Sequence, residues 1–297
     1  MAQQKGGGNG EEPGAAAPLG AETTEIVERG TTVGATRLAR PFLPEALAAF
    51  VGAMSISFGA VAMAYAGGIG TELGGEPLRK LLGALAFPVG FVILLIGKSE
   101  LFTENFLLPV LGVFERRAPL RSLLRIWTVS LAFNLLGAAV FAWLIGRPGV
   151  LDPEATADII EVARFKLSMP WGEAFARAIF AGWLMTILTW LALACHTVGE
   201  RVAIIWMIAA LIVLGRFNHA VISSCEVFMA WSVGLEPDVR RFFLGELAPA
   251  VLGNLVGGVV FVTVLHYLQA RGLQSGKVRA RIRRRHAAAA KRRTAEA

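Results

Sequence analysis

Two short polar stretches interrupt otherwise apolar parts of this sequence, and they hold the residues best suited to chemistry. The first reads GKSELFTEN over residues 97–105, and the second reads GRFNH over residues 215–219. His219 is the one histidine at an interruption, and its unperturbed pKa near ~6.5 makes it a natural proton donor at neutral pH. A helix that starts after an interruption presents free N–H groups and a dipole that favour an anion. Together the two stretches predict a site for small anions.

The elements that carry these stretches are predicted to cross a membrane. Of the 297 residues, 55% are hydrophobic and 17% are charged. Several apolar stretches reach the ~20 residues that span a bilayer, and six crossings result if the interrupted pieces pair up as broken helices. The crossings cover residues 43–65, 81–96 with 105–114, 123–145, 175–194, 203–214 continued to 233, and 247–268. The predicted fold is an all-α integral membrane protein with six transmembrane helices.

The net charge of +7 comes from one end of the chain. Residues 271–297 hold ten of the 29 basic residues and one of the 22 acidic residues, a balance of +9, which leaves −2 for the rest. Basic residues also precede the first span, follow the second and separate the fourth from the fifth, so we expect both termini in the cytoplasm. Residues 1–40 are expected to be disordered. Residues 41–270 would form the membrane domain, and residues 271–297 a tail that binds membrane lipid and no nucleic acid.

A repeat divides the predicted membrane domain into two halves. Asn134 and Gly137 in the third span match Asn254 and Gly257 in the sixth, 120 residues later. The same offset carries residues 101–103 onto residues 221–223, beside the second interruption. With three spans in each half, the second half must be inverted relative to the first. Broken helices in such a repeat are typical of transporters and channels.

These motifs resemble those of the formate/nitrite transporter family. The resemblance covers roughly residues 43–270 and rests on LFT at 101–103, FNH at 217–219 and the two Asn-x-x-Gly helices. It implies an aquaporin-like protomer with an inverted repeat and two broken helices, assembled as a homopentamer with one pore per protomer. The implied substrates are small monovalent anions such as formate, nitrite or hydrosulfide, moved together with protons. The implied location is the bacterial inner membrane.

The resemblance also assigns eleven positions to the pore or the substrate. They are Phe87, Phe91, Leu101, Phe102, Thr103, Lys166, Gly182, Met185, Ile212, Asn218 and His219. Residues 101–103 match a loop that narrows the pore from one side, and Phe87 and Phe91 match an apolar constriction on the external side. His219 matches a central histidine, and Lys166 matches a vestibule lysine that draws anions inward. Met185 and Ile212 match further pore-lining positions.

Four residues depart from the family's pattern. Gly182 stands where an asparagine beside the histidine is common, and Asn218 stands where an acid often precedes the histidine. Lys98 and Glu104 put charges where small or hydroxyl residues are common. These departures are similar to those of a divergent branch of the family.

A proton from His219 offers a route for an anion through the apolar constriction. A bare anion loses several kcal/mol of solvation there, whereas the neutral weak acid does not. The alternative role of His219 is a hydrogen bond to the broken backbone. Arg216 at the same interruption is predicted to pair with Glu226 or Glu100, or to add positive potential at the cytoplasmic mouth of the pore.

Two other classes of protein share some of these sequence features. A neutral-solute channel of the aquaporin kind would share the repeat, although paired Asn-Pro-Ala motifs are missing. A non-conducting membrane scaffold or regulator would explain Lys98 and Glu104. An enzyme is not indicated, because the sequence has no nucleotide loop, metal cluster or nucleophile–base set, and we expect no cofactor. The sequence has only two cysteines, Cys195 and Cys225, which is too few for a disulfide framework.

Overall fold

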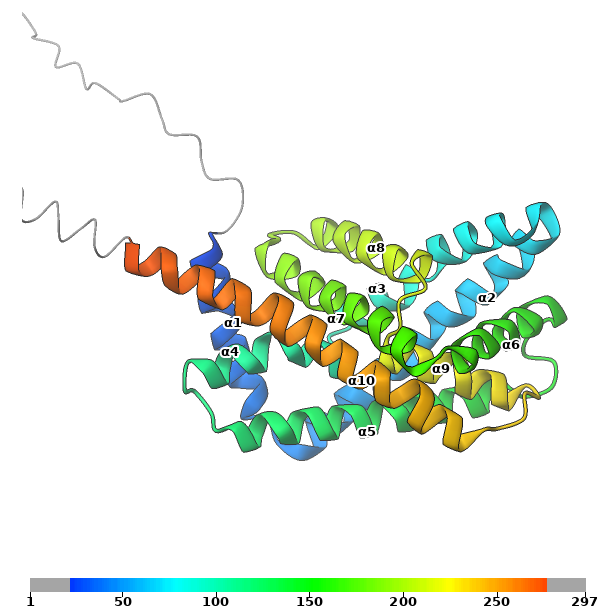
Figure 1. Ribbon diagram of the computed structural model, residues 1–297, viewed down its shortest axis with the longest axis horizontal. Helices are drawn as coiled ribbons and strands as arrows, with labels where there is room; N and C mark the ends of the chain where they lie inside the picture. Colours follow the sequence, from blue (N-terminus) through cyan, green and yellow to red (C-terminus); the bar gives the residue numbers. More distant parts are fainter. Residues whose placement is uncertain (1–21, 277–297) are drawn as a thin grey trace, which may run out of the picture.

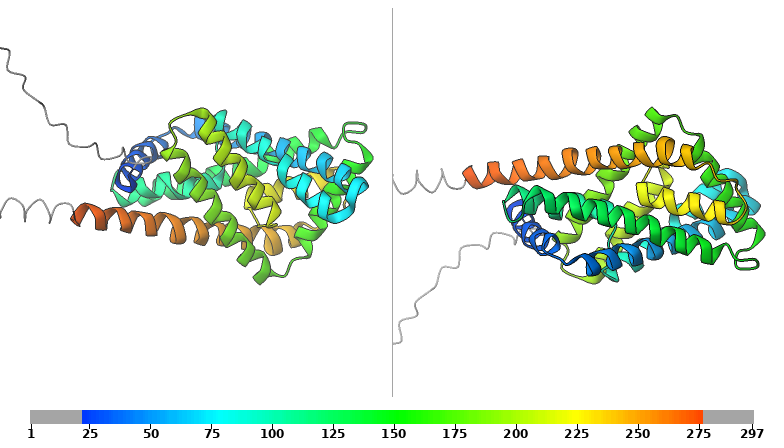
Figure 2. Two further views of the ribbon diagram at one scale, coloured as in Figure 1. Left: turned by 90° about the horizontal axis from the view of Figure 1, so that it is seen from above. Right: turned by 90° about the horizontal axis from the view of Figure 1, so that it is seen from below.

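The computed structural model describes residues 22–276, and this part of the chain is helical without a β-strand (Figure 1). The helices are α1 (Thr23–Leu38), α2 (Phe42–Ala86), α3 (Pro88–Ile96), η1 (Phe102–Phe106), α4 (Leu108–Phe114), α5 (Leu120–Ile145), α6 (Pro153–Ser168), α7 (Trp171–Ala194), α8 (Val198–Leu214), α9 (Ala220–Ser232), η2 (Arg241–Leu247), α10 (Ala248–Leu255) and η3 (Val256–Val264). The last three are parts of one helical stretch, Arg241–Gly276. Both ends of the described chain, α1 and the stretch up to Gly276, lie at the same end of the molecule (Figure 2).

The long element α2 consists of two helical arms that fold back on each other (Figure 1). Gly74 and Gly75 leave the helical conformation, and the φ of 68° at Gly75 lies in the left-handed region that favours glycine. The two arms touch, because a Cβ added to Gly70 would lie 2.6 Å from the Cα of Arg79. The second arm of this hairpin leads through α3 into the first interruption.

The helices have the lengths and compositions of membrane-spanning segments. Four stretches are long and apolar enough to cross a bilayer, namely Phe42–Ile96, Leu120–Ile145, Trp171–Ala194 and Arg241–Gly276. Two shorter apolar stretches, Phe102–Phe114 and Ala220–Ser232, follow the interruptions. Large apolar side chains such as Phe58, Trp143 and Leu265 remain exposed, as expected for surfaces that face lipid or another protomer. These are the features of a multi-pass membrane protein.

The expectation of disorder at the N-terminus is wrong for residues 23–38, which form α1. Ile26, Val27 and Leu38 are buried. Gly34 lies so close to α4 that an added Cβ would be 1.8 Å from the carbonyl oxygen of Leu108. Composition misses this helix because its few apolar and small residues, although sparse, share one helix face. Residues 1–21 and the basic residues 277–297 lie outside the described part of the chain.

Both interruptions begin with the same backbone turn. α3 and α8 each end at a glycine followed by a cation in the left-handed region, Lys98 with a φ of 58° and Arg216 with a φ of 50°. The next residue donates its N–H to a carbonyl five residues back, over 3.0 Å in both interruptions, as from Phe217 to Ile212. This Schellman arrangement satisfies carbonyl groups that the helix end would leave free.

An asparagine then fixes the first interruption between two helices. Asn134 of α5 accepts a hydrogen bond from the backbone N–H of Phe102 over 2.8 Å. Its Nδ2 donates to the carbonyl oxygens of Ala49, at 2.7 Å, and Glu100, at 3.0 Å. One buried side chain thus ties α2, α5 and the interruption together and satisfies backbone groups that no helix can.

Asn254 of α10 makes the same set of contacts at the second interruption. It accepts from the backbone N–H of Ala220 over 2.9 Å. Its Nδ2 donates to the carbonyl oxygens of Ala178, at 2.8 Å, and Asn218, at 2.9 Å. The partners are again a neighbouring long helix, α7, and the backbone on both sides of the interruption.

The two sets of contacts give a register for comparing the interruptions. Glu100 corresponds to Asn218, and the N–H donor Phe102 corresponds to the N–H donor Ala220. Both pairs are 118 residues apart. The predicted match of residues 101–103 with residues 221–223 is therefore wrong by two residues. The reason is that 32 positions separate the donor from its asparagine in the first half and 34 in the second. Leu101 lies where the second interruption has His219.

Candidate functional site

His219 precedes α9, and both of its ring nitrogens have partners. The side chain is fully buried. Nδ1 accepts from the backbone N–H of Ile222 over 3.2 Å, which makes His219 the N-cap of α9, and Nε2 lies 2.8 Å from the hydroxyl oxygen of Thr103. Because Nδ1 accepts, the ring is the neutral tautomer with its proton on Nε2, and Nε2–H donates to Thr103. The two interruptions thus contribute one residue each to a buried polar pair.

The predicted apolar pore residues are buried in the same core, and Phe91 among them contacts this pair. Phe87, Phe91, Leu101, Phe102, Met185 and Ile212 are all at most 2% exposed and belong to one core cluster. The ring of Phe91 meets His219 edge-on, with centroids 6.5 Å apart, and meets Phe87 edge-on at 5.8 Å. An ion beside His219 would therefore face a mostly apolar surface, which strongly disfavours a bare charge.

A chain of hydrogen bonds connects Lys166 to the residue before His219. Lys166 of α6 donates from Nζ to Ser223 Oγ over 3.1 Å, and Ser223 donates to Asn218 Oδ1 over 2.8 Å. Asn218 Nδ2 then donates to Glu246 Oε2 over 3.3 Å. All of these side chains are buried. Two neutral side chains thereby link a lysine at one end of the chain to a carboxyl group at the other.

Sequence reasoning misses Glu246 and considers Glu226 only as a partner of Arg216, although both carboxyl groups belong to this network. Glu226 Oε2 lies 3.7 Å from Lys166 Nζ. One oxygen of each group is buried without a hydrogen-bond partner among the described residues. The available signal is an acid inside an apolar run, in ISSCEVFMAW and in FFLGELAPA, because ionisable residues in such runs usually serve function.

Gly182 has a packing reason to lack a side chain. A Cβ there would lie 2.2 Å from the carbonyl oxygen of Asn254 and 2.4 Å from its Cα, so α7 and α10 touch at this point. The asparagine that the resemblance would place here does not fit this contact. Gly182 instead lets Asn254 come close enough to α7 to hold the second interruption.

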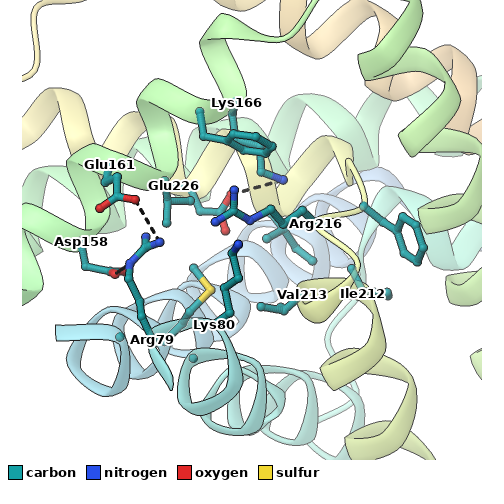
Figure 3. A pocket seen from close by; sticks show the side chains of 16 residues that line it. Arg79, Lys80, Asp158, Glu161, Lys166, Ile212, Val213, Arg216 and Glu226 are labelled. Atoms are coloured by element: carbon teal, nitrogen blue, oxygen red, sulfur yellow. Dashed lines mark hydrogen bonds and ion pairs between the residues drawn. The ribbon is translucent and has the colours of Figure 1, made fainter. Parts of the chain in front are cut away.

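A pocket of about 80 Å³ opens beside the site, between the α2 hairpin, α6 and the end of α8 (Figure 3). Two predicted site residues, Lys166 and Ile212, line it. Its wall also carries Arg79, Lys80 and Arg216, and Figure 3 shows the cationic ends of Lys80, Arg216 and Lys166 pointing toward one another. Three carboxyl groups, those of Asp158, Glu161 and Glu226, line it as well, so the wall has four cationic and three acidic side chains next to the chain of hydrogen bonds.

Arg216 forms its ion pair with Glu76 of the α2 hairpin. The predicted pairing with Glu100 or Glu226 is therefore wrong. The guanidinium also lies over the ring of Phe165, 4.5 Å from its centroid, which is a cation–π contact. The physical reason is the fold-back of α2, which brings residue 76 next to the second interruption across 140 residues of sequence.

Asp158 of α6 is the buried acid of the pocket wall. Burial raises the pKa of its carboxyl, and the guanidinium of Arg79, with Nε 2.5 Å from Oδ1, opposes that rise. Within residues 22–276, no three His, Cys, Asp or Glu side chains are grouped so that they could hold a metal ion. Cys195 and Cys225 are both free thiols.

Known proteins match most of this chain. The family model described as formate/nitrite transporter matches residues 24–268. A probable formate transporter of Methanothermobacter thermautotrophicus is 32% identical over 207 residues, which cover 64% of this chain and 75% of that protein. A solved FNT family ion channel superposes with a TM-score of 0.73 at 20% identity, covering 83% of this chain and 99% of the other. A pentameric formate channel with formate bound superposes with a TM-score of 0.65 at 23% identity, covering 76% and 96%.

Proposed function

This chain belongs to the formate/nitrite transporter family, and we propose that it carries small monovalent anions of the formate, nitrite or hydrosulfide class with His219 as the proton-handling group. The family consists of channels and transporters and not of enzymes. The observation that carries the proposal is the buried pair of His219 Nε2 and Thr103 Oγ1, 2.8 Å apart, among apolar side chains. This pair combines a titratable group and a hydroxyl at the point where both interruptions meet.

The mechanism follows from the partners of the histidine ring. In the neutral state, Nδ1 accepts the N–H of Ile222, so the ring can receive a second proton only by giving up the N-cap bond of α9. The protonated ring can then pass a proton to an anion that reaches Nε2 in place of the Thr103 hydroxyl. The resulting neutral acid passes Phe91 and Phe102 without the desolvation penalty of a charge.

Lys166 and its partners provide the entry to this site. A cation that lines a pocket beside the apolar path raises the local concentration of anions. Its hydrogen bond to Ser223, and from there to Asn218, leads from the pocket to the residue next to His219. Asn218 and Ile212 thus belong to the proposed path, whereas Gly182 has a supporting role in helix packing.

The topology we propose is six crossings arranged as an inverted repeat. The two arms of α2 supply two crossings, the second of which continues through α3, η1 and α4. The third is α5, the fourth α7, the fifth α8 with α9, and the sixth Arg241–Gly276. The equivalent contacts of Asn134 and Asn254 support the repeat. An even number of crossings agrees with two chain ends on one side (Figure 2).

The assembly we propose is a homopentamer in the inner membrane of a bacterial cell, with both termini in the cytoplasm. One structurally similar channel is pentameric. Exposed apolar side chains such as Phe58 and Trp143 would then contact lipid or neighbouring protomers. Native mass spectrometry of the purified protein checks the pentamer, and accessibility of a cysteine tag at each terminus checks the orientation.

The direct test of function is a flux assay on purified protein in lipid vesicles. Uptake of formate, nitrite and hydrosulfide is compared with water permeability at pH 5 to 8, with protein-free vesicles as the blank. The proposal expects anion uptake above the blank that rises as the pH falls. Water flux without anion flux would indicate an aquaporin-like channel instead. No flux of any solute would indicate a scaffold or regulator.

A further inference from the structure

The carboxylate of Glu76 contacts three cations that line the pocket. Glu76 lies just beyond the bend of the α2 hairpin, and its side chain is 44% exposed. Its Oε2 lies 2.9 Å from Arg79 Nη1, and its Oε1 lies 3.1 Å from Lys80 Nζ and also contacts Arg216. Two separate parts of the chain, the hairpin and the second interruption, therefore meet on this single carboxylate.

The three cations differ in how many other carboxylates they contact. Arg79 also pairs with Asp158, at 2.5 Å, and with Glu161, at 3.1 Å. For Lys80 and Arg216, Glu76 is the one carboxylate within ion-pair distance among residues 22–276. Asp158, Glu161 and Glu226 also line the pocket, but none of them lies within ion-pair distance of Lys80 or Arg216. Removing the carboxylate of Glu76 would therefore leave these two cations without an ion-pair partner.

Arg216 is held in place independently of Glu76. Its backbone is fixed in the left-handed turn at the end of α8, and its guanidinium lies 4.5 Å from the ring centroid of Phe165. Lys166 lines the same pocket, and its Nζ points toward the same space (Figure 3). The cationic groups therefore form a prearranged cradle of the kind that binds carboxylates and other small anions.

We propose that Lys80 and Arg216 form an outer binding site for a small monocarboxylate, which Glu76 occupies as a tethered competitor until a free anion displaces it. This extends the proposed function, because the pocket that contains Lys166 would receive anions from this site. Displacement is feasible since Glu76, Lys80 and Arg216 are each about one third or more exposed, and such ion pairs are weak in water. The free anion would then form ion pairs with Lys80 and Arg216 in place of the Glu76 carboxylate.

The test compares Glu76→Gln with a matched control, Glu173→Gln. Glu173 is 43% exposed and pairs with one cation, Arg177, at 2.8 Å. Formate binding is measured by calorimetric titration of each purified protein in detergent. Without the competitor, Glu76→Gln should bind formate about three- to tenfold more tightly than the wild-type protein, and Glu173→Gln should bind like the wild-type protein. An unchanged or weaker affinity in Glu76→Gln would overturn the proposal.

A second variant separates a binding site from a purely structural ion pair. Adding Arg216→Gln to Glu76→Gln should remove the gain in affinity, because the cation that the formate uses is gone. If the double variant keeps the gain, the anion does not bind at Arg216 and the proposal is wrong. If Glu76→Gln fails to fold, Glu76→Asp takes its place, since its shorter side chain should compete less and also tighten formate binding.

The binding measurement is independent of transport. If the wild-type protein conducts no anion but Glu76→Gln still binds formate more tightly, the proposed function fails and the outer site stands. If the wild-type protein conducts formate and Glu76→Gln binds it like the control, the outer site fails and the proposed function stands.

Discussion

The first interruption, residues 97–105, and the second, residues 215–219, have the same backbone turn and differ in the chemistry of their side chains. Both start at a glycine and a left-handed cation, and both are held by an asparagine with one accepting and two donating hydrogen bonds. At the corresponding position, however, the first has Leu101 and the second has His219. The titratable ring therefore comes from one half of the molecule only.

The neighbours of the two interruptions differ in the same way. Glu100 of the first is held by charge, with Arg37 of α1 at 3.3 Å and Arg40 at 2.7 Å. The matching Asn218 of the second is neutral and donates to Glu246 at 3.3 Å. The same asparagine contacts hold the backbone of both interruptions, but ion pairs hold Glu100, whereas Asn218 is neutral and precedes the titratable His219.

The largest expected effect is on the shared frame. Asn134→Ala and Asn254→Ala should each lower the free energy of unfolding by about 3 kcal/mol or more, because each leaves buried backbone groups unpaired. Unfolding in detergent, followed by circular dichroism, measures both. Similar losses for both variants would show that the two asparagines stabilise their interruptions equally. A loss at only one asparagine would show that the two interruptions are not held in the same way.

A smaller effect is expected at the charged clamp of the first interruption. Arg37→Gln leaves the buried carboxyl of Glu104 without the cation that lies 3.7 Å away, and should destabilise the protein by about 2 kcal/mol. The same unfolding assay measures this loss. The control is Glu173→Gln, which removes an exposed ion pair and should lower the free energy of unfolding by less than ~1 kcal/mol. Adding Glu104→Gln should restore part of the loss. If Arg37→Gln behaves like the control, α1 does not clamp this interruption.

The smallest effect concerns the left-handed cations. A non-glycine residue in this region is disfavoured by ~1 kcal/mol, so Lys98→Gly should raise the unfolding free energy by about that amount. Arg216→Gly should gain less, since it also loses the ion pair with Glu76. Equal gains in the unfolding assay would mean that the pair contributes nothing to stability.

The sequence predicts the frame well and the contacts between distant segments poorly. The interruptions are readable because glycine and charged residues stand out inside apolar runs, and both lie where they are predicted. His219 and Thr103, one from each interruption, lie 2.8 Å apart, a contact that the spacing of the motifs does not specify. Likewise, the pairing of Arg216 with Glu76 depends on the fold-back of α2, which no local pattern encodes.

Two other differences have local causes. Composition averaged over the N-terminal residues hides α1, whose buried positions Ile26, Val27 and Leu38 are few but share one face. The two asparagines are 120 residues apart and the corresponding N–H donors are 118 residues apart, since the segment between donor and asparagine has 32 positions in one case and 34 in the other. A single offset read from the asparagine motifs therefore pairs Leu101 with residue 221 and misses its correspondence with His219.

The role of His219 as the proton donor to the permeating anion is tested by the pH profile of formate uptake. The profile of His219→Asn in vesicles is compared with that of the wild-type protein. Asparagine is a good N-cap and does not titrate, so it keeps the cap of α9 and removes the proton donor. His196→Ala, at an exposed histidine, is the control. Since a positioned acid contributes ~100-fold or more, we predict that His219→Asn takes up formate at least that much more slowly and loses the rise at low pH. Uptake by His219→Asn at the wild-type rate with the wild-type pH profile would show that His219 does not supply the proton.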